Sequence, residues 1–335
     1  MGDVAMTVPV VMALTQQYPE VKITVVSRDF YKPLFDNIPN VSFFAFDEKT
    51  RHIGKSGIFQ LYKDIKKLSP DAFLDLHNVI RTKMLRILLR FSLIKIASIY
   101  KGRKAKKELV ALSNKKFRQI ETVFEKQQKA LSTLGFYIDL GNVKPLTNIK
   151  LSLDITNKFQ IDKTARLIGI APFAQYDSKI YPQDLMQIVI NELSLNSRNQ
   201  ILLFGGGSAE IEKLNALKNN LDNVIVIAGE ISFKQELEII FNLDLMLSMD
   251  SGNAHIAAMY NVPTVTLWGA THPIAGFNPF RQPLINALVS DRAQYPLIPT
   301  SIYGNQVVAG YQDAMRTIAP ETVVARINKI LNKSI

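Results

Sequence analysis

The segment Phe241–Pro273 constrains the fold most, because two apolar runs in it flank a glycine turn and a helix-like stretch. Leu243–Met249 and Thr264–Trp268 are short runs bounded by turn residues, which is typical of buried parallel strands. Asn253–Met259 is rich in small residues and directly follows Asp250–Gly252. The segment therefore predicts a strand, a helix and a second strand, the repeating unit of a parallel α/β sheet.

Strand-like and helix-like patterns alternate along the rest of the chain as well. We expect strands at residues 22–27, 41–46, 72–76, 167–171, 200–204, 224–227, 243–249 and 264–268. We expect helices at residues 7–18, 58–68, 82–91, 117–134, 183–193, 209–218, 233–242, 253–259 and 320–331. This alternation is typical of a doubly wound parallel sheet, and 335 residues suffice for two such domains.

The boundary between the expected domains falls in Phe136–Lys163, which is polar and less periodic. We place the first domain at residues 1–150 and the second at residues 151–335. The last helix belongs to the second domain in sequence, and it can pack either there or back against the first domain. Ligands in such folds bind beyond the carboxyl ends of the strands. We therefore expect the site in a cleft between two facing domains.

The opening residues are unusual for a doubly wound domain, because they read as the loop that follows a first strand. We expect that strand to lie upstream of Met1 in the complete fold. Its absence leaves unpaired strand edges. The printed chain is therefore expected to melt at a lower temperature than a chain extended upstream.

The turn Asp250–Gly252 has the features of an anion site. The start of a helix presents unpaired backbone N–H groups and the positive end of the helix dipole. Ser251 adds a hydroxyl, Gly252 permits close approach to the backbone, and His255 lies one turn into the helix. The arrangement suits a diphosphate, although Asp and Ser are also common helix caps and a single His is often a packed core residue.

The net charge of +11 is concentrated in Arg81–Lys107, which holds ten basic residues and no acidic one. Three charges interrupt the apolar stretch within it and argue against a bilayer span. A basic amphipathic surface can contact anionic lipid or a phosphorylated substrate, or it can simply be a solvated helix face. No nucleic-acid-binding motif is recognisable, so nucleic acid is not the expected partner. The chain has no cysteine and no recognisable signal peptide, which is compatible with the cytoplasm.

The pattern D-S-G-x-x-H-I-A at Asp250–Ala257, followed by V-P-T-V-x-L-W-G-x-T at Val262–Thr271, resembles a known family. It is similar to the nucleotide-sugar site of the ADP-heptose:lipopolysaccharide heptosyltransferases, glycosyltransferase family nine. Met1–Pro9 resembles the opening G-D-[VI] loop of that family. Ala171–Pro182 and Phe204–Gly206 resemble its interdomain segment and its next strand–helix turn, so the motifs occur in the family's order.

The resemblance implies a GT-B-type fold of two Rossmann-like domains facing a cleft. It also implies an inverting transfer of heptose from ADP-heptose to the lipopolysaccharide inner core. The enzyme would then work at the cytoplasmic face of the inner membrane, bound to the anionic surface through Arg81–Lys107. Two alternatives stay open: a related transferase with another donor sugar or acceptor, and an inactive nucleotide-sugar-binding relative.

The resemblance also implies roles for individual residues. We expect the base that takes the acceptor proton at Asp3 and the cation for the departing diphosphate at Lys179. The expected donor-binding residues are Asp250, Ser251, Gly252, His255, Gln175, Ser178, Gly205 and Glu210. The expected acceptor-binding residues are His77, Asn78, Arg81, Lys83 and Thr271. No cofactor or metal is expected, because the chain lacks a D-x-D motif and its four histidines are scattered.

Each of these residues also has an ordinary role open to it. Asp3 can cap a helix, Lys179 can be solvated, and Glu210 can be a surface acid rather than a ribose contact. The chain departs from the family at Tyr181, where the family has tryptophan. It departs again at Phe173–Gln175, where the family often has hydroxyl residues, and Gln175 and Ser178 are the expected substitutes there.

Overall fold

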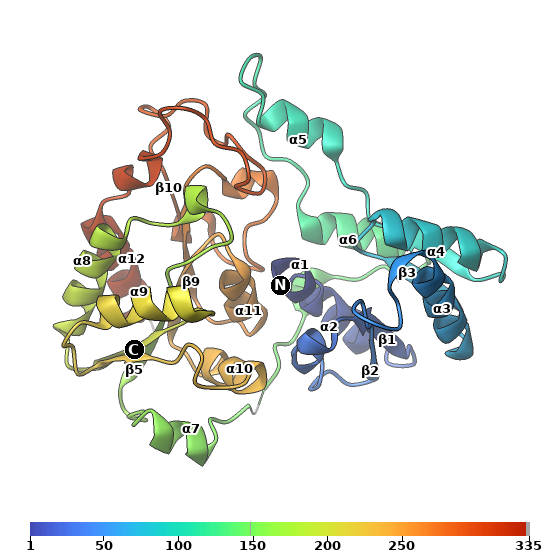
Figure 1. Cartoon of the computed structure of the whole chain (residues 1–335), viewed down its shortest axis with the longest axis horizontal. Helices are drawn as coiled ribbons and strands as arrows, with labels where there is room; N and C mark the ends of the chain where they lie inside the picture. The colour runs from blue at the N-terminus through green and yellow to red at the C-terminus, as the bar shows by residue number, and fades with distance from the viewer. Residues whose placement is uncertain (148, 333–335) are drawn as a thin grey trace. The chain divides into compact units, whose positions relative to one another are not determined.

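A computed structural model describes residues 1–147 and 149–332, and these divide into two compact units (Figure 1). Unit 1 comprises Met1, Asp3–Gly102 and Glu121–Leu146, and unit 2 comprises Gly2, Arg103–Ile120 and the described part of Thr147–Ile335. Arg103–Ile120 thus belongs with unit 2, although the sequence boundary assigns it to the first domain. It does so because Leu109 and Ile120 pack in one apolar cluster with Ala275 and its neighbours.

Unit 2 is built on one six-stranded sheet in the order β10-β9-β8-β5-β6-β7. All of its strand pairs are parallel. The strands are β5 (Arg166–Ala171), β6 (Asn199–Leu203), β7 (Val224–Val226), β8 (Leu245–Met249), β9 (Thr264–Trp268) and β10 (Ala287–Val289). The chain runs outward from β5 to β7 and then returns to β8 on the other side of β5. The strand order therefore reverses between β5 and β8, which is where ligands bind in such sheets.

Helices pack on both faces of this sheet. The helices of unit 2 are α5 (Arg103–Leu109), α7 (Leu153–Lys158), α8 (Gln183–Ser194), α9 (Ser208–Lys218), α10 (Phe233–Phe241), α11 (Gly252–Met259) and α12 (Pro320–Leu331), with short 3-10 turns η3 (Asp177–Lys179), η4 (Pro273–Ala275), η5 (Leu284–Asn286) and η6 (Ala314–Thr317). Figure 1 shows α8, α9 and α12 on one face and α10 and α11 on the other. The doubly wound arrangement predicted for the second half is thus present.

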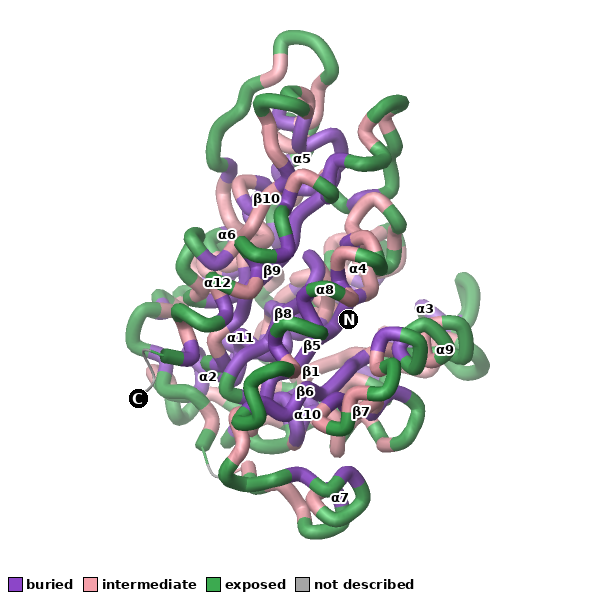
Figure 2. The backbone as a smooth tube through the Cα atoms, turned by 90° about the vertical axis from the view of Figure 1, so that its left-hand side faces the viewer, coloured by how far each residue is buried: buried purple, intermediate pink, exposed green. Residues whose placement is uncertain are grey.

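The four central strands β5, β6, β8 and β9 are almost entirely buried, as their purple colour in Figure 2 shows, whereas β7 and β10 at the two edges are only partly buried. Their apolar side chains pack with those of α8 and α12 in one large core. Gly169 illustrates the density of this packing, because a Cβ there would lie 2.5 Å from the Leu243 side chain. The carboxyl ends of β5 and β8 therefore rest on a rigid, close-packed base.

Unit 1 has a different arrangement of strands. Its elements are α1 (Gly2–Ala5), α2 (Val8–Gln17), β1 (Ile23–Ser27), η1 (Asp29–Leu34), β2 (Val41–Ala45), α3 (Gly54–Lys67), β3 (Ala72–Asp75), α4 (Ile80–Arg90), β4 (Lys95–Ser98), α6 (Val123–Ser132) and η2 (Leu140–Asn142). β1 pairs with β2 and β3 pairs with β4, both in parallel. In the described part of the chain these are two separate two-stranded sheets rather than the single sheet expected. The upstream strand stays a prediction.

Two further sequence-based expectations about unit 1 are wrong. The helix expected at residues 117–134 begins only at Val123, because Thr122 caps it and the Glu125 carboxylate accepts a hydrogen bond from the Thr122 backbone N–H at 2.7 Å. The residues around Asp3, expected in a loop, form α1, in which the Val4 and Ala5 N–H groups donate to the Met1 carbonyl. β4, α5, α7 and β10 were not expected from the sequence at all.

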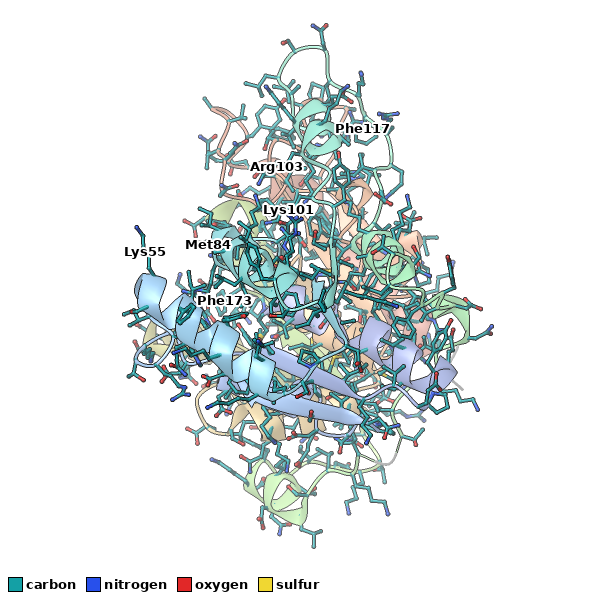
Figure 3. The ribbon with its side chains drawn as sticks, turned by 90° about the vertical axis from the view of Figure 1, so that its right-hand side faces the viewer. Lys55, Met84, Lys101, Arg103, Phe117 and Phe173 are labelled. Carbon is teal, nitrogen blue, oxygen red and sulfur yellow. The ribbon has the colours of Figure 1, made fainter. Side chains whose placement is uncertain are left out.

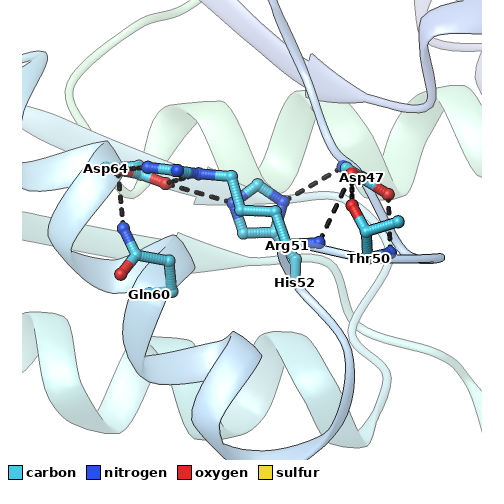
Figure 4. A network of polar contacts seen from close by, with 6 residues as sticks. All are labelled: Asp47, Thr50, Arg51, His52, Gln60 and Asp64. Atoms are coloured by element: carbon cyan, nitrogen blue, oxygen red, sulfur yellow. Dashed lines mark hydrogen bonds and ion pairs between the residues drawn. The ribbon is translucent and has the colours of Figure 1, made fainter.

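A polar network ties the loop after β2 to α3 in unit 1 (Figure 4). The buried Asp64 carboxylate accepts two hydrogen bonds from Arg51, at 2.8 and 2.7 Å, and one from Gln60 at 3.0 Å. His52, fully buried, accepts from the Asp47 N–H through Nδ1 at 3.0 Å, so its Nε2 donates to Asp64 at 3.1 Å. These bonds fix the loop and hold the Asp64 pKa well below its usual range, chiefly through Arg51.

Candidate functional site

Three loops of unit 2 meet beyond the carboxyl ends of β5, β8 and β9, and Asp250 joins them. The Lys179 ammonium, from the loop after β5, lies 3.0 Å from Oδ2 of Asp250, which directly follows β8. The hydroxyl of Thr271, in the loop after β9, donates to the same oxygen at 2.9 Å. The Lys179 and Asp250 side chains are only 13% and 9% exposed, so water screens this pair weakly. The structure thus brings together three residues that the sequence singled out.

The loop that carries Lys179 is fixed on both sides of that residue. The Ser178 carbonyl accepts from the Ala270 N–H at 3.0 Å, which links it to the loop after β9. Tyr181 is buried, and its hydroxyl donates to the Ile318 carbonyl at 2.5 Å. Tyr181 therefore anchors the start of α8 rather than the ligand side of the loop. Gln175, expected at the donor, is exposed at the other end of the same loop.

The turn from β8 into α11 leaves its backbone donors available. Ser251 is the N-cap residue, with extended backbone, but its side chain accepts no hydrogen bond from the helix. Its hydroxyl instead lies 3.0 Å from that of Ser248. The first N–H groups of α11, which starts at Gly252, are therefore left for solvent or an anion. His255 is buried one turn further along α11.

Glu210, the residue expected to contact the ribose, is hydrogen-bonded within the turn that follows β6. The Glu210 carboxylate, in the first turn of α9, accepts from the Gly206 N–H at 2.8 Å. A Cβ at Gly205 would lie 3.1 Å from that carboxylate and 3.0 Å from Leu214, so glycine allows the turn to close. Glu212 is exposed. Ribose binding by Glu210 stays a prediction, and it requires the carboxylate to leave the Gly206 amide.

The predicted acceptor residues of unit 1 follow β3. The His77 and Asn78 N–H groups donate to Asp75 at 3.0 and 2.7 Å, and the Asn78 side chain donates to the Ile99 carbonyl at 2.8 Å. Arg86, not expected from the sequence, bridges Asp75 and the Asn78 side chain. Asn78 therefore holds the end of this sheet together.

The remaining predicted residues of unit 1 lie apart from this network. Arg81 stacks over the Phe46 ring at 4.6 Å, while Lys83 and the His77 side chain are exposed. Asp3, the expected base, is an exposed residue in the first turn of α1. The roles of all four residues stay predictions.

A second cluster of aromatic and basic residues borders Thr271. Arg292 lies over the Phe117 ring at 3.4 Å, and that ring forms a T-shaped pair with the His272 ring, with 5.2 Å between the ring centroids. Burial, and then the Arg292 charge, lower the His272 pKa to about 4. Lys115 donates to the Leu109 and Pro299 carbonyls, and burial lowers its pKa to about 8. Thus Arg103–Ile120 supplies residues that sequence reasoning had not connected with this site.

Comparison with solved structures supports the fold. A glycosyl transferase family 9 protein from Veillonella parvula matches with a TM-score of 0.75 at 19% identity, covering 99% of this chain and 95% of that one. The ADP-heptose lps heptosyltransferase II of E. coli matches with a TM-score of 0.68 at 19% identity, covering 99% and 96%. These likenesses confirm the predicted GT-B-like α/β fold.

Comparison of sequences identifies the family. Residues 58–296 match the model of glycosyltransferase family 9 (heptosyltransferase), and this chain belongs to that family. The enzyme is therefore a glycosyltransferase, as predicted. The lipopolysaccharide core heptosyltransferase OpsX of Haemophilus influenzae is 25% identical over 289 residues, which cover 82% of this chain and 77% of that protein. A lipopolysaccharide heptosyltransferase 3 of Escherichia coli is 24% identical over 313 residues, 88% of each chain.

Proposed function

We propose that this glycosyltransferase moves heptose from ADP-heptose to the inner core of lipopolysaccharide with inversion. The observation that carries the proposal is the Lys179–Asp250–Thr271 cluster beside the uncapped start of α11, at the point where the strand order reverses. A diphosphate placed there meets an ammonium group and backbone N–H donors together. The names of the similar proteins support heptose and the lipopolysaccharide core as the groups joined.

In the proposed reaction the acceptor hydroxyl attacks the anomeric carbon of the sugar in a single displacement. The new C–O bond forms as the bond to the diphosphate breaks, and ADP leaves with the electron pair. Lys179 and the N–H groups of Ser251 and Gly252 stabilise the charge that develops on the diphosphate. Asp250 holds the Lys179 ammonium in position, and Thr271 in turn donates a hydrogen bond to Asp250. The lysine side chain therefore needs little rearrangement during the reaction. Asp3 is the proposed base for the acceptor proton.

A nucleotide-release screen tests this function. ADP-heptose, ADP-glucose and a UDP-sugar are each supplied with and without a lipopolysaccharide core acceptor. The expected result is ADP release that requires both ADP-heptose and the acceptor. Faster release from another donor favours a related transferase, and binding without any release favours the inactive relative. Asp3→Asn is expected to lose transfer but to keep ADP affinity, because it removes the base and leaves unit 2 unchanged.

A surface for anionic lipid is proposed on α4 of unit 1. Exposed apolar side chains recur at helical spacing along one face of α4 and at the residue that caps its end, with Ile80, Ile87 and Phe91 exposed by 78%, 55% and 84%. Exposed Lys83 and Arg90 accompany them on the helix. Met84 of the same face is labelled in Figure 3, as is Lys55 at the start of neighbouring α3. Apolar residues flanked by basic ones suit the interface of an anionic membrane. This supports a peripheral location at the cytoplasmic face of the inner membrane.

Vesicle sedimentation tests this surface. No helix in the described part of the chain is both long and apolar enough to span a bilayer. The protein is expected to sediment with phosphatidylglycerol vesicles but not with phosphatidylcholine vesicles. Ile87→Gln should weaken this binding, whereas Ile188→Gln, at an exposed isoleucine of α8 in unit 2, should not. Equal weakening by both variants would remove α4 as the lipid surface.

A further inference from the structure

Gly304 lies directly against the side chain of Lys179. A Cβ at Gly304 would stand 2.4 Å from Lys179 Cδ, 2.7 Å from its Cγ and 3.3 Å from the Ser178 hydroxyl. Carbon atoms do not approach that closely, so any side chain at residue 304 would displace the lysine stem. No motif that we recognised in the sequence marks this glycine. Its contact with Lys179 cannot be inferred from the sequence, because the two residues lie far apart along the chain.

The strap 300–304, which comprises Thr300 to Gly304, is hydrogen-bonded to two of the three loops of the site, the loop after β5 and the loop after β9. Ser178 donates through its hydroxyl to the Gly304 carbonyl at 2.6 Å. The Gly304 N–H donates to the Ser301 hydroxyl at 2.9 Å, and the Ser301 N–H donates to the Ala270 carbonyl at 3.2 Å. The Ala270 N–H donates to the Ser178 carbonyl at 3.0 Å, which closes the circuit. These four bonds form a closed ring beside the lysine stem, so the strap cannot move away without breaking them.

We propose that Gly304 is a positioning residue, whose missing side chain lets the Lys179 stem lie along strap 300–304 and bring its ammonium to Asp250. The inference rests on the proposed function, because Lys179 acts there on the diphosphate. Lys179 Nζ lies 3.0 Å from Asp250, and a shift of the stem by about 1 Å would break that contact. Misplacement of a catalytic group by about 1 Å can lower a rate by about 100-fold.

A matched glycine separates this effect from backbone strain. Gly304 has φ +88°, a conformation that L residues adopt with strain. Gly310 has φ +80° in the same unit, but a Cβ there would meet nothing within 4 Å. Alanine at residue 310 therefore carries similar strain without touching Lys179. The difference between Gly304→Ala and Gly310→Ala isolates the contact with the lysine.

The test compares the two alanine variants in the full chain. Gly304→Ala is expected to lower kcat by roughly 10- to 100-fold and to weaken ADP binding, whereas Gly310→Ala leaves both near wild type. Equal kcat values for the two variants would overturn the proposal. Wild-type protein that releases no ADP from ADP-heptose would instead count against the proposed function, and ADP affinity would still test Gly304.

A stability cycle keeps the test valid if Gly304→Ala folds poorly. Thermal melting is measured for wild type, Gly304→Ala, Lys179→Ala and the double variant. If the lysine stem is what the new methyl group strikes, Gly304→Ala should lower Tm less when Lys179 is already alanine. The same fall in Tm in both backgrounds would show that only the backbone of residue 304 matters, and would overturn the inference.

Discussion

The two units hold their strands in different ways. In unit 2, β6, β8 and β9 are buried at every residue within a six-stranded sheet. In unit 1, β1 and β2 have no fully buried residue and pair only with each other among the described strands. Unit 1 relies instead on polar ties such as the Asp64 network. The Lys179–Asp250 pair thus stands on the more rigid base, while unit 1 should open more readily.

The largest expected effect comes from removing the charge at the rigid site. Lys179→Met keeps the length and apolar stem of the side chain but deletes its ammonium, and leaves Asp250 with only Thr271. Loss of one group that stabilises developing charge typically lowers kcat by about 100- to 1000-fold. The rate of steady-state ADP release, compared between Lys179→Met and wild type, measures this fall in kcat.

Lys213→Met is the control for this change, because Lys213 is an exposed lysine on α9 of the same unit. It should retain wild-type kcat. Wild-type activity in Lys179→Met would show that unit 2 holds this ion pair for structural reasons alone.

Matched leucine truncations in the two units test the difference in packing. Leu247→Ala in β8, at a fully buried residue, should lower the free energy of unfolding by about 2–5 kcal/mol. Leu74→Ala in β3 should cost less than about 2 kcal/mol, because Leu74 is only half-buried and loses fewer contacts. Urea unfolding followed by circular dichroism gives both values. Equal losses would mean that the strands of the two units are packed equally well.

The strands β5 to β9 of unit 2 were predictable because each is an apolar run that ends at a glycine or polar turn, whereas the short strand β10 was not expected. The motif order also marked Lys179, Asp250 and Thr271 correctly as residues of one region. What the sequence did not reveal is that they contact one another, because that depends on the pairing of β5, β8 and β9. Gly304 was missed for the same reason, since its importance lies in the proximity of a distant lysine.

The predictions for unit 1 were weaker because its local signals conflict. β4 lies in a stretch where Arg and Lys interrupt apolar residues, a pattern that also fits a helix. The expected helix at residues 117–134 ignored Thr122 and Glu125, whose spacing is the signature of a helix start. Phe117 lies before that start and packs in unit 2, which no periodicity indicates.

The polar network of unit 1 gives the next largest effect. Asp64→Asn removes the charge that Arg51 and His52 pair with, and should lower the free energy of unfolding by about 1–3 kcal/mol. The Asp64 pKa is lowered in the folded state, so its stabilisation is present above the ordinary Asp pKa of about 4 and is lost below it. Melting curves near neutral pH and below pH 4 measure both effects.

The variant itself supplies the control for the pH effect. Asp64→Asn should lose less stability than wild type on acidification below about pH 4, because its residue 64 no longer titrates. A parallel loss in the two proteins would show that Asp64 does not carry the acid sensitivity of unit 1.

The smallest expected effect is the pH response of His272 in unit 2. Its pKa of about 4 lies below the ordinary value of 6.5, so between these values the unfolded chain binds more protons than the folded one. Stability therefore falls as the pH drops through this window, and protonation of Nδ1 would also end its bond from the Ile274 N–H. His272→Asn keeps an acceptor for that N–H and should lower the Tm difference between pH 7 and pH 5.

His77→Asn is the control, because His77 is exposed in unit 1. It should leave the difference in Tm between pH 7 and pH 5 unchanged. If His272→Asn also leaves it unchanged, the acid response of unit 2 lies elsewhere.

A crystal structure with ADP bound tests most directly whether the rigid sheet of unit 2 carries the diphosphate site. The diphosphate should lie within hydrogen-bond distance of the Lys179 ammonium and of the Ser251 and Gly252 N–H groups, beyond the carboxyl ends of β5 and β8. A diphosphate bound away from this point, with Lys179 contacting only Asp250, would contradict the assignment.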